Sequence, residues 1–156
     1  MIETLNHLPH PHESAAALAG HFTDLAPPLN DRQAHLEASR CLYCYDAPCV
    51  NACPSEIDIP SFIRNIHQDN VPGAAQKILS ANILGGSCAR VCPTEILCQQ
   101  ACVRNNAHEC APVLIGLLQR YAVDNANFSE HPFQRAAASG KRIAVVGAGP
   151  AGLSCA

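Results

Sequence analysis

The sequence has 156 residues, enough for one ordinary domain or for a small domain joined to part of another. Its formal net charge is -3, which gives no electrostatic reason to expect nucleic acid or an anionic membrane as a partner. Aromatic residues make up only 4% of the chain and tryptophan is absent, whereas ten residues are cysteines. We therefore expect a small aliphatic core that depends on a second source of stability.

The cysteines and the N-terminus together indicate a compartment. The first twenty residues, MIETLNHLPHPHESAAALAG, lack the basic start and apolar core of a secretory signal. No stretch approaches the roughly 18 apolar residues of a membrane span. We expect a soluble, cytoplasmic chain without a membrane partner, in which thiols stay reduced and clustered cysteines bind metal rather than form disulfides.

Residues 1–29 are rich in alanine, histidine and proline and are predicted to be a poorly ordered N-terminal segment. Three histidines in HLPHPH, at positions 7, 10 and 12, offer nitrogen ligands for a metal. A solvated tail is the favoured interpretation of this composition.

Residues 30–127 are predicted to form an all-helical domain. NDRQAHLEASR begins after a good N-cap residue, Asn30, and PGAAQKILSANI begins with a helix-compatible proline. PVLIGLLQRYAVDN has a continuous apolar face and is the strongest helix signal. Strand signals are missing here, so the predicted fold class is mainly α. IPSFIRNIHQ places four apolar residues on one helix face: Ile59, Phe62, Ile63 and Ile66.

Two runs of four cysteines interrupt these helices. Zinc modules usually present two CxxC pairs separated by a longer loop, but the second run has no CxxC. The spacing is closer to the ferredoxin run, where three cysteines bind one 4Fe–4S cluster and the fourth, before proline, binds another. It favours iron–sulfur over zinc and indicates that the first run is not one closed site. The runs are Cys41, Cys44, Cys49 and Cys53, and then Cys88, Cys92, Cys98 and Cys102.

Residues 128–140 are predicted to be a linker, and residues 141–156 the start of a Rossmann-type FAD/NAD(P)-binding domain. A short apolar run, Ile143–Val146, predicts a buried strand, and GAGPAG then supplies a GxGxxG turn that opens a helix. Gly147 permits the tight turn, Gly149 lets a pyrophosphate approach, and Gly152 allows close helix–strand packing. The alternative is a glycine-rich turn of any parallel sheet.

The acidic residue expected to bind a ribose about 20 residues further on is not in this sequence, nor are the other strands of such a domain. We therefore expect a truncated flavin domain, present either as a fragment or as a remnant.

Several segments together resemble one family: ASRCLYCYDAPCVNACPSEIDIPSFI, GAAQKI, CARVCPTEILCQQAC and IGLLQRYA, followed by the glycine-rich turn. The family is the N-terminal iron–sulfur domain, an alpha-helical ferredoxin-like fold, shared by dihydropyrimidine dehydrogenases and the glutamate synthase small subunit. The resemblance covers roughly residues 32–156. Within the family, the sequence is most similar to the subunit of bacterial NAD-dependent dihydropyrimidine dehydrogenase that carries flavin and iron–sulfur centres.

The resemblance also implies a set of cluster ligands. Counting thiols selects Cys88 as the eighth ligand, whereas the family pattern selects a glutamine, Gln119, and leaves Cys88 packed beside the cluster. Glutamate synthase small subunits carry a glutamate at the matching position, so Gln119 favours the pyrimidine enzyme. One 4Fe–4S cluster receives Cys41, Cys44, Cys49 and Cys102, and the other receives Cys53, Cys92, Cys98 and Gln119.

The function implied is electron transfer from NAD(P)H, via FAD and two 4Fe–4S clusters, to a catalytic partner subunit whose flavin site reduces uracil or thymine. No side chain of this chain is expected to act as acid, base or nucleophile, because the cofactors carry the chemistry. The alternatives are part of an NADPH-dependent glutamate synthase small subunit, a zinc-stabilised helical module without a redox role, and a truncation product that never assembles.

Overall fold

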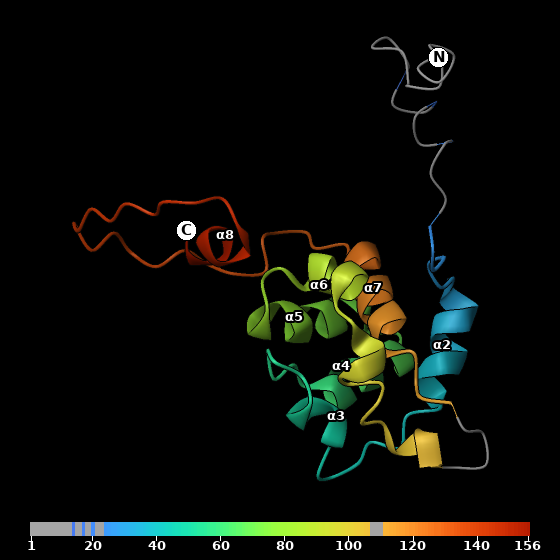
Figure 1. Ribbon diagram of the computed structural model, residues 1–156. Helices are drawn as coiled ribbons and strands as arrows, with labels where there is room; N and C mark the ends of the chain where they lie inside the picture. Colours follow the sequence, from blue (N-terminus) through green and yellow to red (C-terminus); the bar gives the residue numbers. More distant parts are fainter. Residues whose placement is uncertain (1–13, 15–16, 18–19, 21–23, 107–110) are drawn as a thin grey trace, which may run out of the picture.

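The computed structural model describes residues 24–106 and 111–156, together with residues 14, 17 and 20. The three N-terminal histidines lie outside the described residues, as does most of the segment predicted to be poorly ordered. Every regular element of the described chain is a helix (Figure 1), and none of these helices combines the length and apolar character needed to cross a membrane. The elements are α2 (Asp31–Ser39), α3 (Pro48–Asn51), α4 (Ile59–His67), α5 (Val71–Ala81), α6 (Gly85–Val91), the 3-10 helices η1 (Thr94–Ile96) and η2 (Val103–Asn106), α7 (Ile115–Asn125) and α8 (Pro150–Cys155).

The helices begin where local side-chain chemistry satisfies their first N–H groups. The predicted N-cap Asn30 is confirmed: its Oδ1 accepts a 2.9 Å hydrogen bond from the Gln33 N–H, and Gln33 Oε1 accepts one of 3.0 Å from the Asn30 N–H. This reciprocal capping box satisfies two otherwise unpaired donors. α4 and α5 have simpler caps: the Asp58 side chain accepts from the Ser61 N–H and the Asn70 side chain from the Gly73 N–H, and both helices have proline in the first turn.

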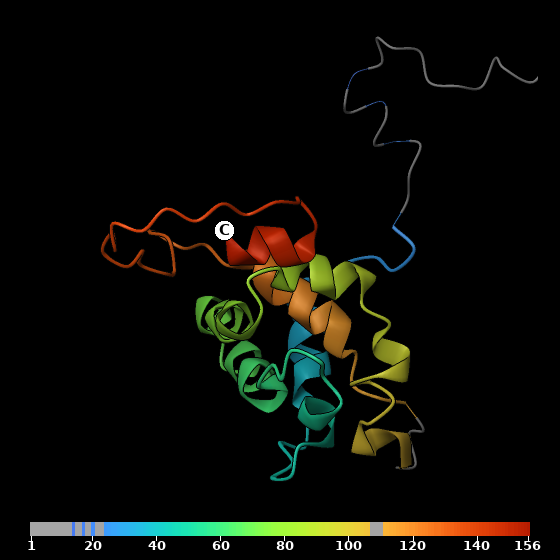
Figure 2. The same cartoon turned by 60° about the vertical axis from the view of Figure 1, so that its left-hand side comes forward.

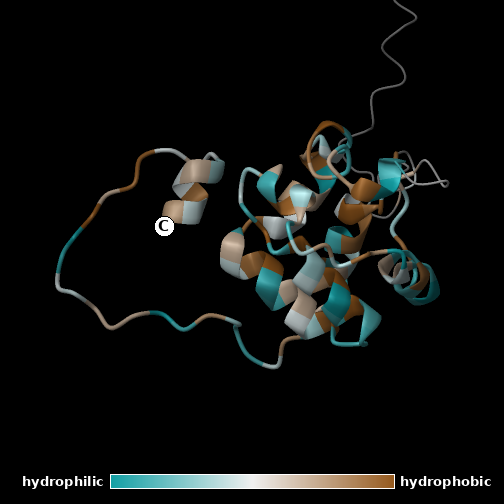
Figure 3. Cartoon of the chain, turned by 90° about the horizontal axis from the view of Figure 1, so that it is seen from below, coloured by the Kyte–Doolittle hydropathy of each residue, from teal (hydrophilic) through white to brown (hydrophobic). Residues whose placement is uncertain are grey.

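The core is built from aliphatic faces of α2, α4, α5 and α7. α4 packs against α2 and α5, and α7 packs against α5 and α6 (Figure 2). The predicted apolar face of α4 is confirmed, and Phe62 at its centre is fully buried. Polar and apolar residues alternate along the same helices, so each helix buries only one side (Figure 3).

The last helix of this body starts later than its apolar pattern predicts. The pattern begins at Pro112, but α7 begins at Ile115. Tertiary hydrogen bonds hold the intervening backbone: Arg40 Nη1 donates to the Pro112 carbonyl at 3.1 Å, and the Leu114 N–H donates to Glu37 Oε1 at 2.8 Å. If the helix began at Pro112, the Pro112 carbonyl and the Leu114 N–H would lie in different positions relative to Arg40 and Glu37.

The strand predicted at Ile143–Val146 is not formed, because no described residue lies in a strand. Ile143 and Val146 are 84% and 97% exposed. A strand needs a neighbour for its backbone hydrogen bonds, and the described chain offers none. The segment between α7 and α8 instead leaves the helical body and returns to it (Figures 1 and 2).

The helix predicted after the glycine-rich turn is confirmed as α8, with Gly149 as its N-cap. Gly147 adopts φ +114°, a conformation that L side chains rarely adopt. A Cβ atom at Gly152 would clash with the Gly147 carbonyl oxygen. The turn is therefore tight at Gly147 and Gly152, although the strand before it is missing.

Candidate metal centres

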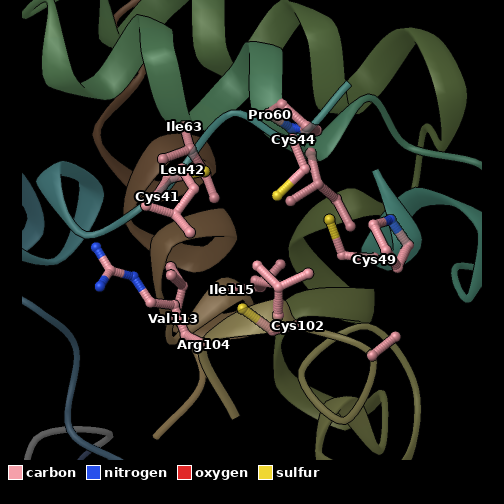
Figure 4. Close-up of a pocket in the computed structure, with 14 residues that line it drawn as sticks. Cys41, Leu42, Cys44, Cys49, Pro60, Ile63, Cys102, Arg104, Val113 and Ile115 are labelled. Carbon is pink, nitrogen blue, oxygen red and sulfur yellow. The ribbon is translucent and has the colours of Figure 1, made fainter. Parts of the chain in front are cut away.

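Four cysteines from two distant segments line one pocket. Cys41, Cys44 and Cys49 come from the first run, and Cys102 comes from the end of the second. Their labelled side chains surround the pocket together with aliphatic residues such as Ile63 and Ile115 (Figure 4). Among the described residues, no three His, Cys, Asp or Glu side chains form a site for a single metal ion. We call this pocket the first site.

Helix ends and an unusual loop present these thiols. Cys41 follows α2 directly, and its N–H donates to the Ala38 carbonyl at 3.1 Å. Cys49 lies in the short helix α3. Between them, Tyr43 and Ala47 adopt φ +52° and +37°, and left-handed backbone in such residues costs roughly 1–3 kcal/mol each. This strained loop bends the chain around Cys44.

Two thiols of the first site resist ionisation. Burial, with smaller contributions from the neighbouring Cys41 and Cys102, raises the pKa of Cys49 to about 11. Burial also raises the pKa of Cys41, while the Tyr43 N–H and the Arg104 charge act in the opposite direction. A positively charged metal centre in this pocket would stabilise thiolates at these two positions.

The remaining cysteines of the two runs form a second group, which we call the second site. Cys98 is buried, and burial raises its pKa to about 12, with added contributions from Cys53 and Cys92. The pKa of Cys92 is also raised, first by burial and then by Cys88. These mutual effects show that the thiols lie close together.

Gln119 is the one buried polar side chain of the described core, at 6% exposure. Its Nε2 donates a 2.8 Å hydrogen bond to the Gly85 carbonyl at the start of α6. Within the described chain, its carbonyl oxygen Oε1 accepts no hydrogen bond. Burying an amide oxygen without a hydrogen-bond partner costs free energy, and a cation bound to this oxygen would remove that cost.

The face of α7 that carries Gln119 is turned towards the second cysteine run. Gly116, one turn earlier on the same face, donates its N–H to Gln99 Oε1 at 3.2 Å. A Cβ at Gly116 would lie 3.2 Å from Thr94 Cγ2, so glycine allows this close approach. Thr94 and Gln99 each lie within two residues of a second-site cysteine, Cys92 or Cys98.

Cys88 also lies beside this group. It belongs to α6, three residues after Gly85, and it is one of the groups that raise the pKa of Cys92. The structure thus brings both candidates for the eighth ligand to α6: Gln119 bonds to Gly85 at the start of this helix, and Cys88 is one of its residues.

The glycine-rich turn lies next to the second site. Pro150, Ala151 and Ser154 of α8 line one pocket together with Cys88 and Cys92. Gly149 has open space where a side chain would stand, as a turn that receives a phosphate requires. The predicted cofactor-binding glycines therefore lie near a predicted cluster rather than apart from it.

Sequence reasoning missed two arginines: one lines the first site and the other is bonded to it. Arg104 lines the pocket, and its Nε donates a 2.8 Å hydrogen bond to the Arg40 carbonyl. Arg40 in turn forms a 2.6 Å ion pair with Glu37. The only sequence feature that could have indicated them is their distance from the cysteines: Arg40 directly precedes Cys41, and Arg104 follows Cys102 by two residues.

Comparison with known proteins gives one consistent picture. Residues 18–131 match the family described as dihydropyrimidine dehydrogenase domain II, 4Fe-4S cluster. The chain is 45% identical over 134 residues to the NAD-dependent dihydropyrimidine dehydrogenase subunit PreT of Escherichia coli (strain K12), covering 85% of this chain and 32% of that protein. The Salmonella typhi PreT homolog is 43% identical over the same coverage.

A second kind of relative is more distant. The glutamate synthase [NADPH] small chain of Escherichia coli (strain K12) is 35% identical over 137 residues, covering 86% of this chain and 29% of that protein. The chain thus spans about a third of the length of the curated relatives it matches.

Proposed function

Because the chain belongs to the dihydropyrimidine dehydrogenase domain II family of 4Fe–4S cluster domains, we propose that it is the electron-transfer portion of an iron–sulfur flavoprotein oxidoreductase. The observation that carries this proposal is the first site, where four thiols from segments far apart in the sequence line one pocket. Soft thiolate ligands suit iron–sulfur clusters, and the apolar lining limits access of water.

Each of the two sites supplies the proposed ligands of one cluster. The buried thiols and the unpartnered Gln119 oxygen support the assignment, since both need a cationic centre to satisfy them. A cluster at the first site would be held by Cys41, Cys44, Cys49 and Cys102, and a cluster at the second by Cys53, Cys92, Cys98 and Gln119.

When bound, a 4Fe–4S cluster accepts and donates single electrons. The residues of this chain hold, orient and shield the clusters, and none acts as acid, base or nucleophile towards a substrate. As a ligand, the amide of Gln119 would replace a thiolate by a neutral group and make the second centre less negative. The reduction potential of that centre would then be higher than that of an all-cysteine centre in the same pocket.

The complete electron path extends beyond these residues. We propose that Gly147, Gly149 and Gly152 belong to an FAD-binding domain whose flavin is reduced by NAD(P)H. The position of α8 beside Cys88 and Cys92 supports electron transfer between that flavin and the second site. The acceptor is a partner subunit with a flavin site, in a cytoplasmic hetero-oligomer that reduces uracil or thymine. This step rests on the 45% identity to the dihydropyrimidine dehydrogenase subunit.

A glutamate synthase small subunit is the second candidate, supported by the 35% identity to that chain. Gln119 favours the pyrimidine enzyme, because a glutamate is expected at this position in the other subunit. A zinc-stabilised helical module is a third candidate, which metal analysis distinguishes.

Anaerobic purification of the chain tests the proposal. We expect iron and acid-labile sulfide in amounts matching two 4Fe–4S clusters, visible colour, and an EPR signal after reduction with dithionite. A colourless protein that contains zinc and no labile sulfide would contradict the electron-transfer role. NADH-dependent uracil reduction by the full-length subunit and its partner, compared with glutamate formation, separates the first two candidates.

A further inference from the structure

Arg104 occupies a position that the ligand assignment leaves unexplained. It lies in η2, two residues after Cys102, and lines the first site with the four thiols. Its side chain extends from the Cys102 segment along the edge of the pocket towards Cys41 (Figure 4). A permanent cation therefore borders the pocket that holds the proposed cluster.

Arg104 also joins the two segments that form the first site. Its 2.8 Å hydrogen bond to the Arg40 carbonyl spans 64 residues of sequence and connects the residue before Cys41 to the segment after Cys102. Arg40 is itself anchored, because its guanidinium donates to the Ala111 carbonyl at 2.7 Å and pairs with Glu37. The Arg104 contact thus links the chain just before Cys41 to the chain just after Cys102.

The charge of Arg104 lies at the first site. Its side chain lines the pocket together with the proposed ligands Cys41 and Cys102. A cluster bound by four thiolates is negative and becomes more negative when it is reduced. A nearby cation stabilises the reduced form more than the oxidised form.

We infer that Arg104 is a tuning and positioning residue of the first cluster, raising its reduction potential while holding the Cys41 and Cys102 segments together. This inference rests on the ligand set proposed above. The reduction potential of each cluster then has its own determinant: a cation at the first site and a neutral amide at the second.

The test is a redox titration of the purified chain, followed by EPR, for the unmodified protein and for R104Q, R104K and R32Q. Cys49→Ser identifies which signal belongs to the first cluster. We expect R104Q to lower the equilibrium constant for reduction of the first cluster about tenfold, which is a fall of about 59 mV in its reduction potential for a one-electron couple. The reduction potential of the second cluster should stay unchanged. R104K keeps the charge and should stay close to the unmodified potential. Arg32 is exposed on α2 and lines neither site, so R32Q should change neither potential.

The outcomes separate this inference from the function proposed above. Both clusters present with an unchanged first potential in R104Q would overturn the tuning role. An equal fall in R104K and R104Q would also overturn it, by assigning the effect to the lost hydrogen bond. If R104Q loses the first cluster, R104K decides: an intact cluster at the unmodified potential supports the inference, and its loss there too makes Arg104 purely structural. Absence of iron and sulfide from the unmodified chain would overturn the proposed function and this inference together.

Discussion

At the scale of single residues, the cysteines are poorly suited to exist as free thiolates. Burial and mutual repulsion raise the pKa of Cys49 to about 11 and that of Cys98 to about 12, so both thiols are protonated at neutral pH. Binding of an iron–sulfur cluster replaces these protons by a cationic centre and couples assembly to folding. The ligands therefore stabilise the fold only when the cluster is present.

This coupling predicts the effect of removing one ligand of the first site. Cys41→Ser or Cys49→Ser should lose one cluster, about half of the iron and labile sulfide, and part of the helical circular dichroism. Cys155→Ser is the matched control, because that thiol is exposed on α8 and should leave the iron content unchanged. Full iron and unchanged helicity in both first-site variants would refute the ligand assignment.

The eighth ligand is a choice between two neighbouring residues. If Gln119 binds the second cluster, Gln119→Ala should expose one iron, favour its oxidative loss, and give the EPR signal of a three-iron centre after exposure to air. Cys88→Ala should keep both clusters with a modest loss of stability, because it removes a half-buried thiol. Iron-to-protein ratios and low-temperature EPR of the two variants provide the measurement.

The opposite pattern would support thiol counting. Should Cys88→Ala lose a cluster while Gln119→Ala retains two, Cys88 is the ligand and the Gln119 assignment fails. Gln119→Glu is a useful third variant, since it keeps an oxygen ligand but adds a negative charge. It should retain the second cluster and lower its reduction potential.

At the scale of helices, the short helices are stabilised by their caps and by tertiary contacts, because they are not long enough to be stable alone. The helices α2 and α4 have nine residues each, too few to be stable alone in water. The capping box at Asn30 fixes where α2 begins, and α2 in turn delivers Cys41 to the first site. Helix stability and cluster geometry are therefore linked through α2.

Asn30→Ala should consequently lower the free energy of unfolding by about 1 kcal/mol, because the Gln33 N–H loses its side-chain acceptor. Asn30→Asp keeps the acceptor and should stay close to the unmodified protein. Chemical denaturation of the cluster-loaded chain measures both variants. Equal stability of all three proteins would show that the capping box does not limit the stability of α2.

At the scale of the whole molecule, the helical body is small and nearly free of large aromatic residues in its core. Its fully buried side chains are aliphatic apart from Phe62. α8 contacts this body beside Cys88 and Cys92, while the segment before it extends away. The arrangement resembles a cofactor-dependent domain with a second, separately organised unit attached.

This arrangement predicts weak flavin binding by the 156 residues. The described chain has one glycine-rich turn and no strand, and a dinucleotide is normally held across several strands of a sheet. The chain should therefore purify with clusters and without FAD, as measured by fluorescence of the acid-released flavin. Stoichiometric FAD in the purified chain would contradict this expectation.

The helices were predictable from sequence because their signals are local. Asn30 and the apolar spacing of α4 act within a few residues, and both predictions are confirmed. The start of α7 was not predictable in this way, since Glu37 and Arg40 hold the preceding backbone from another helix. The strand at Ile143–Val146 was predicted wrongly for a related reason: apolar character favours a strand, but pairing requires a neighbour.

The same distinction applies to the candidate sites. Cysteine spacing was enough to indicate iron–sulfur chemistry, because thiolate ligands at short intervals are a chemical property of the sequence itself. Bringing Cys102 to the pocket of Cys41, placing Arg104 at its edge and leaving the Gln119 oxygen without a partner required the packed helices. Those features depend on contacts between segments more than thirty residues apart. Such contacts arise when helices bury their apolar faces together, and no local pattern in the chain encodes their geometry.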